Sequence, residues 1–156
     1  PVCGQILNFF SKIQDKGFRI ENSGTEFYAF GSYCGIDNCY LNARTLPGSE
    51  DIYAVFVACP ELKSWTLATE TYNKIKLRLS ERYTQSTHSE TFTESGYAGN
   101  ELKYLHEGKC SYTSSFNAPG GVIYVAITPG SKKGRALVLV SFLDNDGLER
   151  LALTEN

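Results

Sequence analysis

An amphipathic stretch over residues 64–83 limits most strongly what the rest of the chain can fold into. Its apolar residues recur in steps of three and four, which places them on one stripe of a helix. They are Trp65, Ala68, Tyr72, Ile75, Leu79 and Tyr83. Ser64 precedes them, where a hydroxyl can accept a hydrogen bond from an amide of the first turn. The pattern predicts a helix that packs this stripe against a core, with Trp65 largely buried.

Shorter elements are predicted on both sides of this helix. Before it we expect a helix over 5–16 and strands over 27–34, 39–46 and 52–59. After it we expect an edge strand over 89–93, a short helix over 100–107, strands over 110–116, 122–128 and 136–143, and a tail over 148–156. Residues 35–38 are read as a four-residue hairpin loop. The run from Asp144 to Gly147 is read as a turn.

The order of these elements repeats, because each half reads as a helix followed by three antiparallel strands. Residues 41–59 align without gaps on 123–141, which superimposes two Pro-Gly-Ser turns that begin at Pro47 and Pro129. We therefore predict an α+β fold, a tandem repeat of a helix plus a three-to-four-stranded antiparallel sheet. Residues 1–60 form the first repeat and 61–156 the second. Neither half alone would bury much core, so the two should pack as one compact unit.

Composition and charge exclude several classes of function. With 42% apolar and 21% charged residues, the chain of 156 residues has the composition of an ordinary globular domain. A net charge of −2 gives no general attraction for nucleic acid, so no nucleic-acid partner is expected. No apolar run approaches the ~20 residues that cross a bilayer as a helix. Glycine-rich phosphate-binding motifs do not occur, and no cofactor is predicted.

The start of the chain suggests a compartment. The sequence opens at Pro1 and contains no Met, so we expect that preceding residues have been removed. A cleaved signal peptide is one interpretation, and it would place the protein outside the cell or in a periplasm.

Residues with catalytic or metal-binding chemistry do not form a recognisable motif. His88 and His106 stand in neither a serine nor a cysteine nucleophile context, so no catalytic residue is assigned. The cysteines and histidines lack the spacing of a metal site. The run from Asp144 to Gly147 superficially resembles the start of a calcium loop but lacks the later ligands, which favours a plain turn and no metal.

The first predicted hairpin carries the candidate binding residues. If Cys34 lies opposite Cys39, the face shared by these cysteines also carries Phe30, Ser32, Leu41 and Ala43, and it is assigned to the core. The other face then carries Tyr33, Tyr40, Asn42 and Arg44. Tyrosine, asparagine and arginine are favoured where proteins grip one another, so these four are the predicted binding site. Alternatively, the tyrosines only stabilise a solvent-facing sheet by cross-strand pairing.

The same pairing raises the question of a disulfide. The chain has five cysteines, an odd number, so at least one is free or pairs between chains. Opposite positions in antiparallel strands bring α-carbons to ~4.5–5.5 Å, within disulfide range. A Cys34–Cys39 bridge is therefore one possibility, and two reduced thiols packed in the core are the other.

Several runs of the sequence resemble a known group of proteins. They are Val2-Cys3-Gly4-Gln5-Ile6, Lys16-Gly17-Phe18, Gly31-Ser32-Tyr33-Cys34-Gly35 and the segment from Gly121 to Ile127. In these runs the chain resembles small secreted proteins of gut commensal bacteria. One departure is that Thr84 follows Tyr83 where many relatives have Gly. The order of elements is also similar to the β-lactamase-inhibitor-protein fold. The resemblance rests on glycines and core residues, so it implies no catalytic role.

The sequence thus leads to three hypotheses about function. The first is a secreted or periplasmic binding module that contacts a macromolecule, expected to be a protein, through an antiparallel sheet face. The alternative is a small hydrolase of cell-wall or dietary polymers, with carboxylates assembled between the two halves. The third is a structural component of the cell envelope. A pocket with two carboxylates or a Cys/His pair would favour the hydrolase, and an exposed aromatic sheet face would favour binding.

Overall fold

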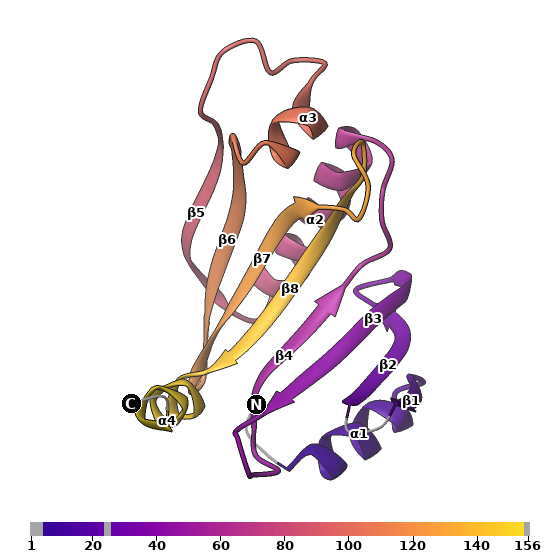
Figure 1. Cartoon of the computed structure of the whole chain (residues 1–156), viewed down its shortest axis with the longest axis vertical. Helices are drawn as coiled ribbons and strands as arrows, with labels where there is room; N and C mark the ends of the chain where they lie inside the picture. The colour runs from indigo at the N-terminus through magenta and orange to yellow at the C-terminus, as the bar shows by residue number, and fades with distance from the viewer. Residues whose placement is uncertain (1–4, 24–25, 155–156) are drawn as a thin grey trace.

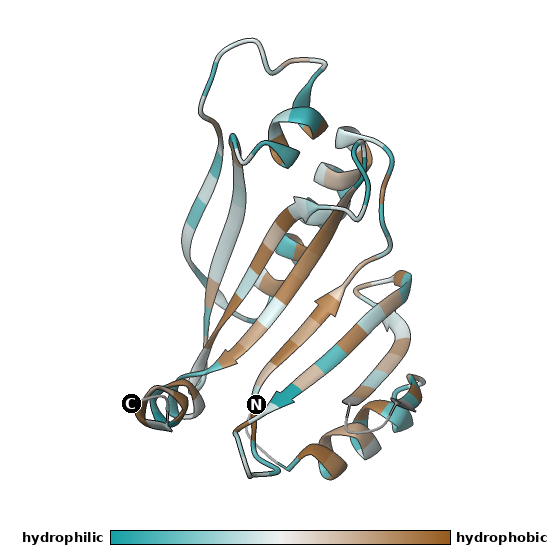
Figure 2. Cartoon of the chain, in the orientation of Figure 1, coloured by the Kyte–Doolittle hydropathy of each residue, from teal (hydrophilic) through white to brown (hydrophobic). Residues whose placement is uncertain are grey.

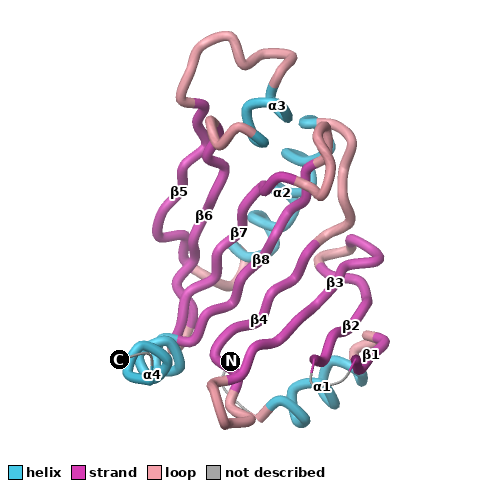
Figure 3. The backbone as a smooth tube through the Cα atoms, in the orientation of Figure 1, coloured by secondary structure: helices cyan, strands magenta, loops and turns pink. Residues whose placement is uncertain are grey.

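The computed structural model describes residues 5–23 and 26–154. In this part of the chain, eight strands form one antiparallel sheet in the order β1-β2-β3-β4-β8-β7-β6-β5 (Figures 1 and 3). The strands are β1 (Arg19–Ser23), β2 (Glu26–Tyr33), β3 (Ile36–Thr45), β4 (Ile52–Ala58), β5 (Thr84–Phe92), β6 (Cys110–Ala118), β7 (Gly121–Pro129) and β8 (Ala136–Asp144). The helices are α1 (Ile6–Asp15), α2 (Trp65–Ser80), α3 (Glu101–His106) and α4 (Asn145–Thr154). The predicted α+β class is confirmed.

Each half of the chain contributes four neighbouring strands to the sheet. Strands β1 to β4 follow α1 and strands β5 to β8 follow α2, with α3 between β5 and β6. The two groups meet where β4 pairs with β8, and Val57 lies opposite Val140 at that junction. Long-range pairing of β4 with β8 therefore joins the two halves into one sheet.

The core lies between one face of this sheet and the helices α1 and α2. Figure 1 shows α2 behind β7 and β8. Its Tyr72 and Ile75 are fully buried in the same cluster as Val125, Val138 and Val140 of the sheet. Phe10 of α1 belongs to that cluster as well. In Figure 2 strongly apolar residues alternate with less apolar ones along β7, as expected for a strand with one covered face, whereas β8 is apolar along almost its whole length.

Helix α2 forms as its sequence predicts. The Ser64 hydroxyl accepts a hydrogen bond from the Leu67 amide at 3.2 Å, and the four buried residues of α2 are Ala68, Tyr72, Ile75 and Leu79. Trp65, at the start of the stripe, is partly buried and packs against the core cluster. Its ring makes edge contacts with Tyr112 and Phe92, at centroid distances of 4.9 and 5.4 Å.

Three sequence predictions need correction outside the hairpin. Residues 19–23 form β1 where no strand was expected, and β5 spans 84–92 rather than 89–93. The predicted turn and tail after β8 are instead α4. The Asp144 carboxylate accepts a hydrogen bond from the Gly147 amide at 2.9 Å and so caps that helix. The two Pro-Gly-Ser segments stand at corresponding connections, the first between β3 and β4 and the second, which begins at the last residue of β7, between β7 and β8.

Candidate functional site

The first hairpin turns earlier than its sequence suggests. Its loop is the two-residue turn Cys34-Gly35, with positive φ angles of 51° and 75°, rather than a loop of four residues. This is the backbone of a type I′ turn, whose twist matches that of the flanking strands. Asn38, also at positive φ (57°), lies at an irregularity of the pairing between Gly31 and Tyr33. Cys39 therefore lies opposite Gly31 and not opposite Cys34.

The altered register exchanges the two faces of β2. A shift by an odd number of residues moves every side chain of a strand to the other face. Phe30, predicted to face the core with Ser32, lies opposite Tyr40, and Tyr28 lies opposite Asn42. Ala29 is fully buried opposite Leu41. A pairing of Cys34 with Cys39 would also place Tyr33 opposite Tyr40 and Ala29 opposite Arg44, and neither pair forms. The alternation predicted along β3 holds.

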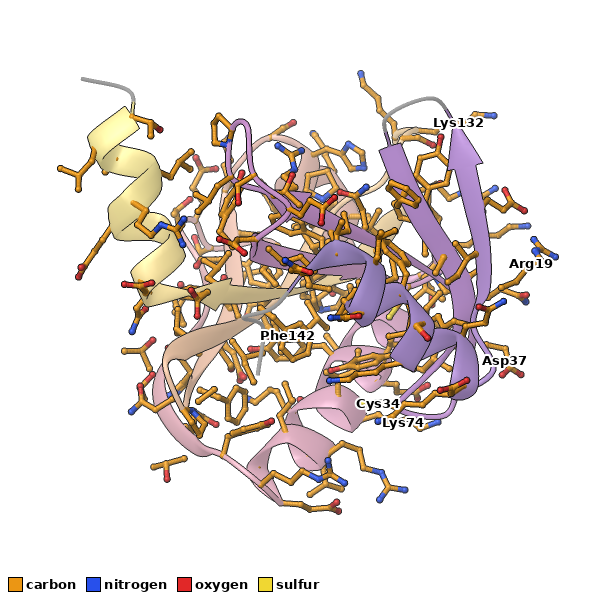
Figure 4. All side chains as sticks on the ribbon, turned by 90° about the horizontal axis from the view of Figure 1, so that it is seen from below. Arg19, Cys34, Asp37, Lys74, Lys132 and Phe142 are labelled. Carbon is orange, nitrogen blue, oxygen red and sulfur yellow. The ribbon has the colours of Figure 1, made fainter. Side chains whose placement is uncertain are left out.

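We call the sheet face that carries Tyr28, Phe30, Tyr40, Asn42, Arg44 and Phe56 the open face, and the face beneath α1 and α2 the covered face. The structure brings Tyr40, Asn42 and Arg44 of the predicted site together on the open face. It separates Tyr33 from them, because Tyr33 lies on the covered face with its ring 6.4 Å from that of Phe142. Figure 4 shows α4 on the opposite side of the sheet from α2, at one end of the open face.

Aromatic rings and arginines are packed together on the open face. The Tyr40 ring lies 5.7 Å from the Tyr28 ring and 5.5 Å from the Phe30 ring. The Arg44 guanidinium lies 5.6 Å from the centre of the Phe56 ring, and that of Arg19 lies 5.6 Å from the Phe30 ring. Such cation–π contacts hold the arginines flat while their edges stay available to an acidic partner.

A shallow hollow lies beside this cluster. Its volume is about 590 Å³, and Tyr40, Asn42, Arg44, Tyr53 and Phe56 are among its lining residues. The Asn42 amide donates a hydrogen bond to the Phe27 carbonyl at 3.3 Å, which fixes the side chain at the edge of the hollow. Sequence reasoning missed Tyr28, Phe30 and Phe56 as members of this surface, because their placement depends on the pairing register.

Of the two possibilities for Cys34 and Cys39, the structure has the reduced thiols and not the bridge. Both thiols are free, Cys34 lies in the turn, and Cys39 contacts Cys59 instead, with 3.8 Å between the sulfur atoms. Cys3 lies outside the described residues. Burial raises the pKa of Cys34 and also that of Cys110, to about 11 for the latter, so neither thiol resembles an activated nucleophile.

The covered face holds two adjoining cavities that the sequence did not indicate. The larger, of about 780 Å³, lies between α1 and Tyr83, which follows α2, over a floor that includes Leu41, Val57 and Phe142. The smaller, of about 430 Å³, includes Arg78 and Arg82 in its lining. Their walls come from segments far apart in the chain, so local periodicity could not reveal them.

Acid–base and metal chemistry have little support in the described residues. The larger covered-face cavity has one carboxylate, Asp144, and the smaller has one, Glu81. His88 is exposed on β5, and the His106 ring is hydrogen-bonded to the Arg135 carbonyl at 2.8 Å. Within residues 5–23 and 26–154, no group of three or more His, Cys, Asp or Glu residues is placed to hold a metal ion. None of the described helices is long and apolar enough to cross a membrane.

Comparisons of the chain with protein-family models, with curated proteins and with solved structures each found no match.

Proposed function

We propose that this protein is a binding module that contacts a partner protein with the open face of its sheet. The observation that carries the proposal is the cluster of Tyr28, Phe30, Tyr40 and Phe56, partly exposed and flanked by two arginines. Tyrosine and arginine supply much of the binding energy at protein interfaces, since each combines a large apolar area with a polar tip.

The charges on this surface indicate the kind of partner. Arg19 forms an ion pair with Glu21 at 3.1 Å, whereas Arg44 has no ion pair among the described residues. The Arg44 guanidinium is exposed and rests over Phe56, so a carboxylate of the partner can meet it edge-on. A partner surface with an acidic residue beside an apolar patch would complement this face.

The hydrolase alternative receives less support from the same geometry. Hydrolysis of glycosidic bonds requires two carboxyl groups across one site. In the described part of the chain, Asp144 and Glu81 line different cavities, and Asp144 is engaged in capping α4. The hollow on the open face includes no carboxylate in its lining.

We also propose that the two halves, 1–60 and 61–156, are copies of one helix-plus-sheet unit, as in the β-lactamase-inhibitor-protein fold. The order of α1 with β1–β4 and α2 with β5–β8 supports this proposal, and so does the junction at β4 and β8. A secreted or periplasmic location, as in the gut commensal proteins that the sequence resembles, remains part of the proposal. It would expose the open face to partners outside the cytoplasm.

The proposal is tested by capturing partners from culture fluid and envelope extract with the immobilised protein. The test variant is Tyr40→Ala/Arg44→Ala, which removes one ring and one cation from the open face. The matched control is Leu67→Ala/Lys63→Ala, which changes an exposed apolar and an exposed basic residue at the start of α2. Both variants should keep the circular dichroism spectrum of the wild-type protein.

A protein retained by the wild type and the control but lost from the test variant supports the proposal. The purified partner should then bind the test variant at least about tenfold more weakly, because central aromatic and arginine contacts contribute more than 1 kcal/mol each. Equal retention by all three proteins would exclude the open face as the contact site.

A further inference from the structure

We infer that the two cavities of the covered face together form a binding site for a single-chain anionic amphiphile, that is, an alkyl chain with a negatively charged head. This site lies on the opposite side of the sheet from the open face, so the inference is independent of the proposed function. It rests on the joining of an apolar cleft to a pocket that carries arginines.

The larger cavity suits an alkyl chain. Its volume of about 780 Å³ lies within the range of pockets that bury small ligands. Phe9 and Ile13 of α1 form one wall, and the floor includes Val55, Val57 and Ile123 of the sheet. Figure 4 shows Phe142, another lining residue, on the side of the sheet where α1 and α2 pack.

The cleft exists because α1 and α2 pack over different parts of the sheet. Helix α2 contacts β6, β7 and β8, whereas α1 contacts β1. The floor between them is left without a helix, and apolar side chains such as Val55 and Leu41 line the gap. An apolar ligand placed there would complete the layer that the two helices leave incomplete.

The smaller cavity adjoins the cleft and shares four lining residues with it, Tyr33, Cys34, Tyr83 and Phe142. Arg78 and Arg82 line only the smaller cavity. Arg78 is paired with Glu81 at 3.4 Å, while Arg82 has no ion pair among the described residues. A chain that lies in the cleft and passes the rings of Tyr33 and Phe142 therefore brings its head group beside these guanidinium groups.

Charge complementarity selects the sign of the head group. Arg78 and Arg82 outnumber the one carboxylate of the smaller cavity, Glu81. The guanidinium group of arginine can donate two parallel hydrogen bonds to either a carboxylate or a phosphate. The arginines therefore suit a fatty acid and a single-chain anionic phospholipid equally well. A cationic or uncharged head of the same chain length would lack this interaction.

The test is isothermal titration calorimetry of the full chain with octanoate, decanoate and dodecanoate, each below its micelle concentration. Dodecyltrimethylammonium and dodecyl maltoside carry the same chain on a cationic and an uncharged head. We expect the affinity for the carboxylates to rise about fourfold per added methylene, which corresponds to ~0.8 kcal/mol for each buried CH₂. Dodecanoate should bind at least about tenfold more tightly than dodecyltrimethylammonium.

Two variants locate the head and the chain. Arg78→Gln/Arg82→Gln should weaken dodecanoate about tenfold and leave dodecyl maltoside unchanged. Ala118→Trp places a bulky ring in the cleft from a partly exposed position of β6 and should weaken both ligands. Ser11→Trp, at an exposed position of α1 outside the cleft, is its matched control and should bind as the wild type does.

Affinity that does not depend on chain length or head-group charge would overturn the inference, and so would an Ala118→Trp variant that binds dodecanoate normally. Lauroyl-lysophosphatidylglycerol distinguishes the two sources of the ligand. If it binds more tightly than dodecanoate, the ligand is a phospholipid, and the reverse order assigns a free fatty acid. Failure of these titrations would leave the open-face capture experiment unaffected.

Discussion

Cys39 and Cys59 face each other across β3 and β4, with 3.8 Å between their sulfur atoms. They lie one position beyond the paired residues Tyr40 and Ala58, and both are buried. Directly opposite positions in antiparallel strands lie within disulfide range. Cys39, which the sequence offered as a possible partner for Cys34, therefore contacts Cys59 instead. The two residues are 20 positions apart along the chain.

We predict that oxidation joins Cys39 to Cys59. With oxidised glutathione, two thiol–disulfide exchanges would form the bond and release two molecules of reduced glutathione. The hydrogen bond shared by the two thiols lowers the pKa of the Cys39 thiol, while that bond and burial raise the pKa of the Cys59 thiol, so Cys39 supplies the attacking thiolate. Because the thiolate is the attacking species, oxidation should become faster as the pH rises from 7 to 9. The bond should stabilise the fold by about 3 kcal/mol in the chain-entropy model.

Mass spectrometry of the alkylated, unreduced protein identifies the linked peptide. Cys110→Ser is the control and should leave the linkage intact, whereas Cys59→Ser should abolish it. A peptide that joins Cys34 to Cys39 would contradict the assignment.

Tyr72→Phe should destabilise the fold by removing a buried hydrogen bond with Ser114. The Tyr72 hydroxyl lies 2.6 Å from the Ser114 hydroxyl, and both residues are 0% exposed. Burial raises the pKa of Tyr72 to about 12, so the phenol is neutral at physiological pH. Removing its oxygen leaves the Ser114 hydroxyl without that partner, which should lower the free energy of unfolding by about 1–3 kcal/mol in urea titrations.

The double variant Tyr72→Phe/Ser114→Ala separates this cause from a packing defect. Removing both polar partners should recover part of the lost stability. Tyr124→Phe, at a residue that is 39% exposed, is the control and should change the free energy of unfolding by less than about 0.5 kcal/mol. A double variant that is as unstable as the sum of its single changes would argue against the hydrogen bond.

Glu90 should make stability depend on pH in the acid range. Its hydrogen bond with Lys76 of α2 lowers the pKa of the carboxyl group. A lowered pKa in the folded state stabilises the fold above the ordinary carboxyl pKa of ~4.3, and this contribution is lost as the pH falls through the folded value. We expect about 1 kcal/mol or less, because the side chain is 32% exposed.

The measurement is the free energy of unfolding of wild type and Glu90→Gln at pH 7 and at pH 3. The difference between them should be present at pH 7 and should shrink at pH 3. Glu70→Gln, an exposed position of α2 without an ion pair among the described residues, should show no such dependence. An identical loss of stability on acidification in Glu90→Gln and wild type would contradict the prediction.

Trp65→Ala should cost stability through lost aromatic contacts. The Trp65 ring joins the start of α2 to Phe92 of β5 and Tyr112 of β6. Because Trp65 is only partly buried, we expect a loss of about 2–3 kcal/mol, below the 3–5 kcal/mol typical of a fully buried Trp. Trp65→Phe should retain most of the stability, and an unchanged urea midpoint in Trp65→Ala would show that these contacts contribute little.

The spacing of apolar residues was enough to predict those elements whose pattern fits only one kind of secondary structure. The stripe of α2 and the Ser64 cap were predictable, because helix spacing and capping act within a few residues. The alternation of buried and partly exposed residues along β3, from Cys39 to Arg44, was predictable for the same reason.

Tertiary structure decided which face of β2 joins the core. Ala29 and Phe30 are both apolar, so alternation alone could not choose between them. The turn at Cys34-Gly35 set the register, and with it the surface on which Tyr40 and Arg44 meet their neighbours.

Helix α4 also could not be predicted from the local sequence. Gly147 near the start of α4 is a weak helix former, and the sequence around it reads as a turn. In the structure an added Cβ at Gly147 would lie 2.6 Å from the Cβ of Tyr53, so close packing requires the glycine. The Asp144 cap then holds the first turn. Contacts between residues distant in sequence, which no local pattern records, determined α4, the Cys39–Cys59 pair and the cavities of the covered face.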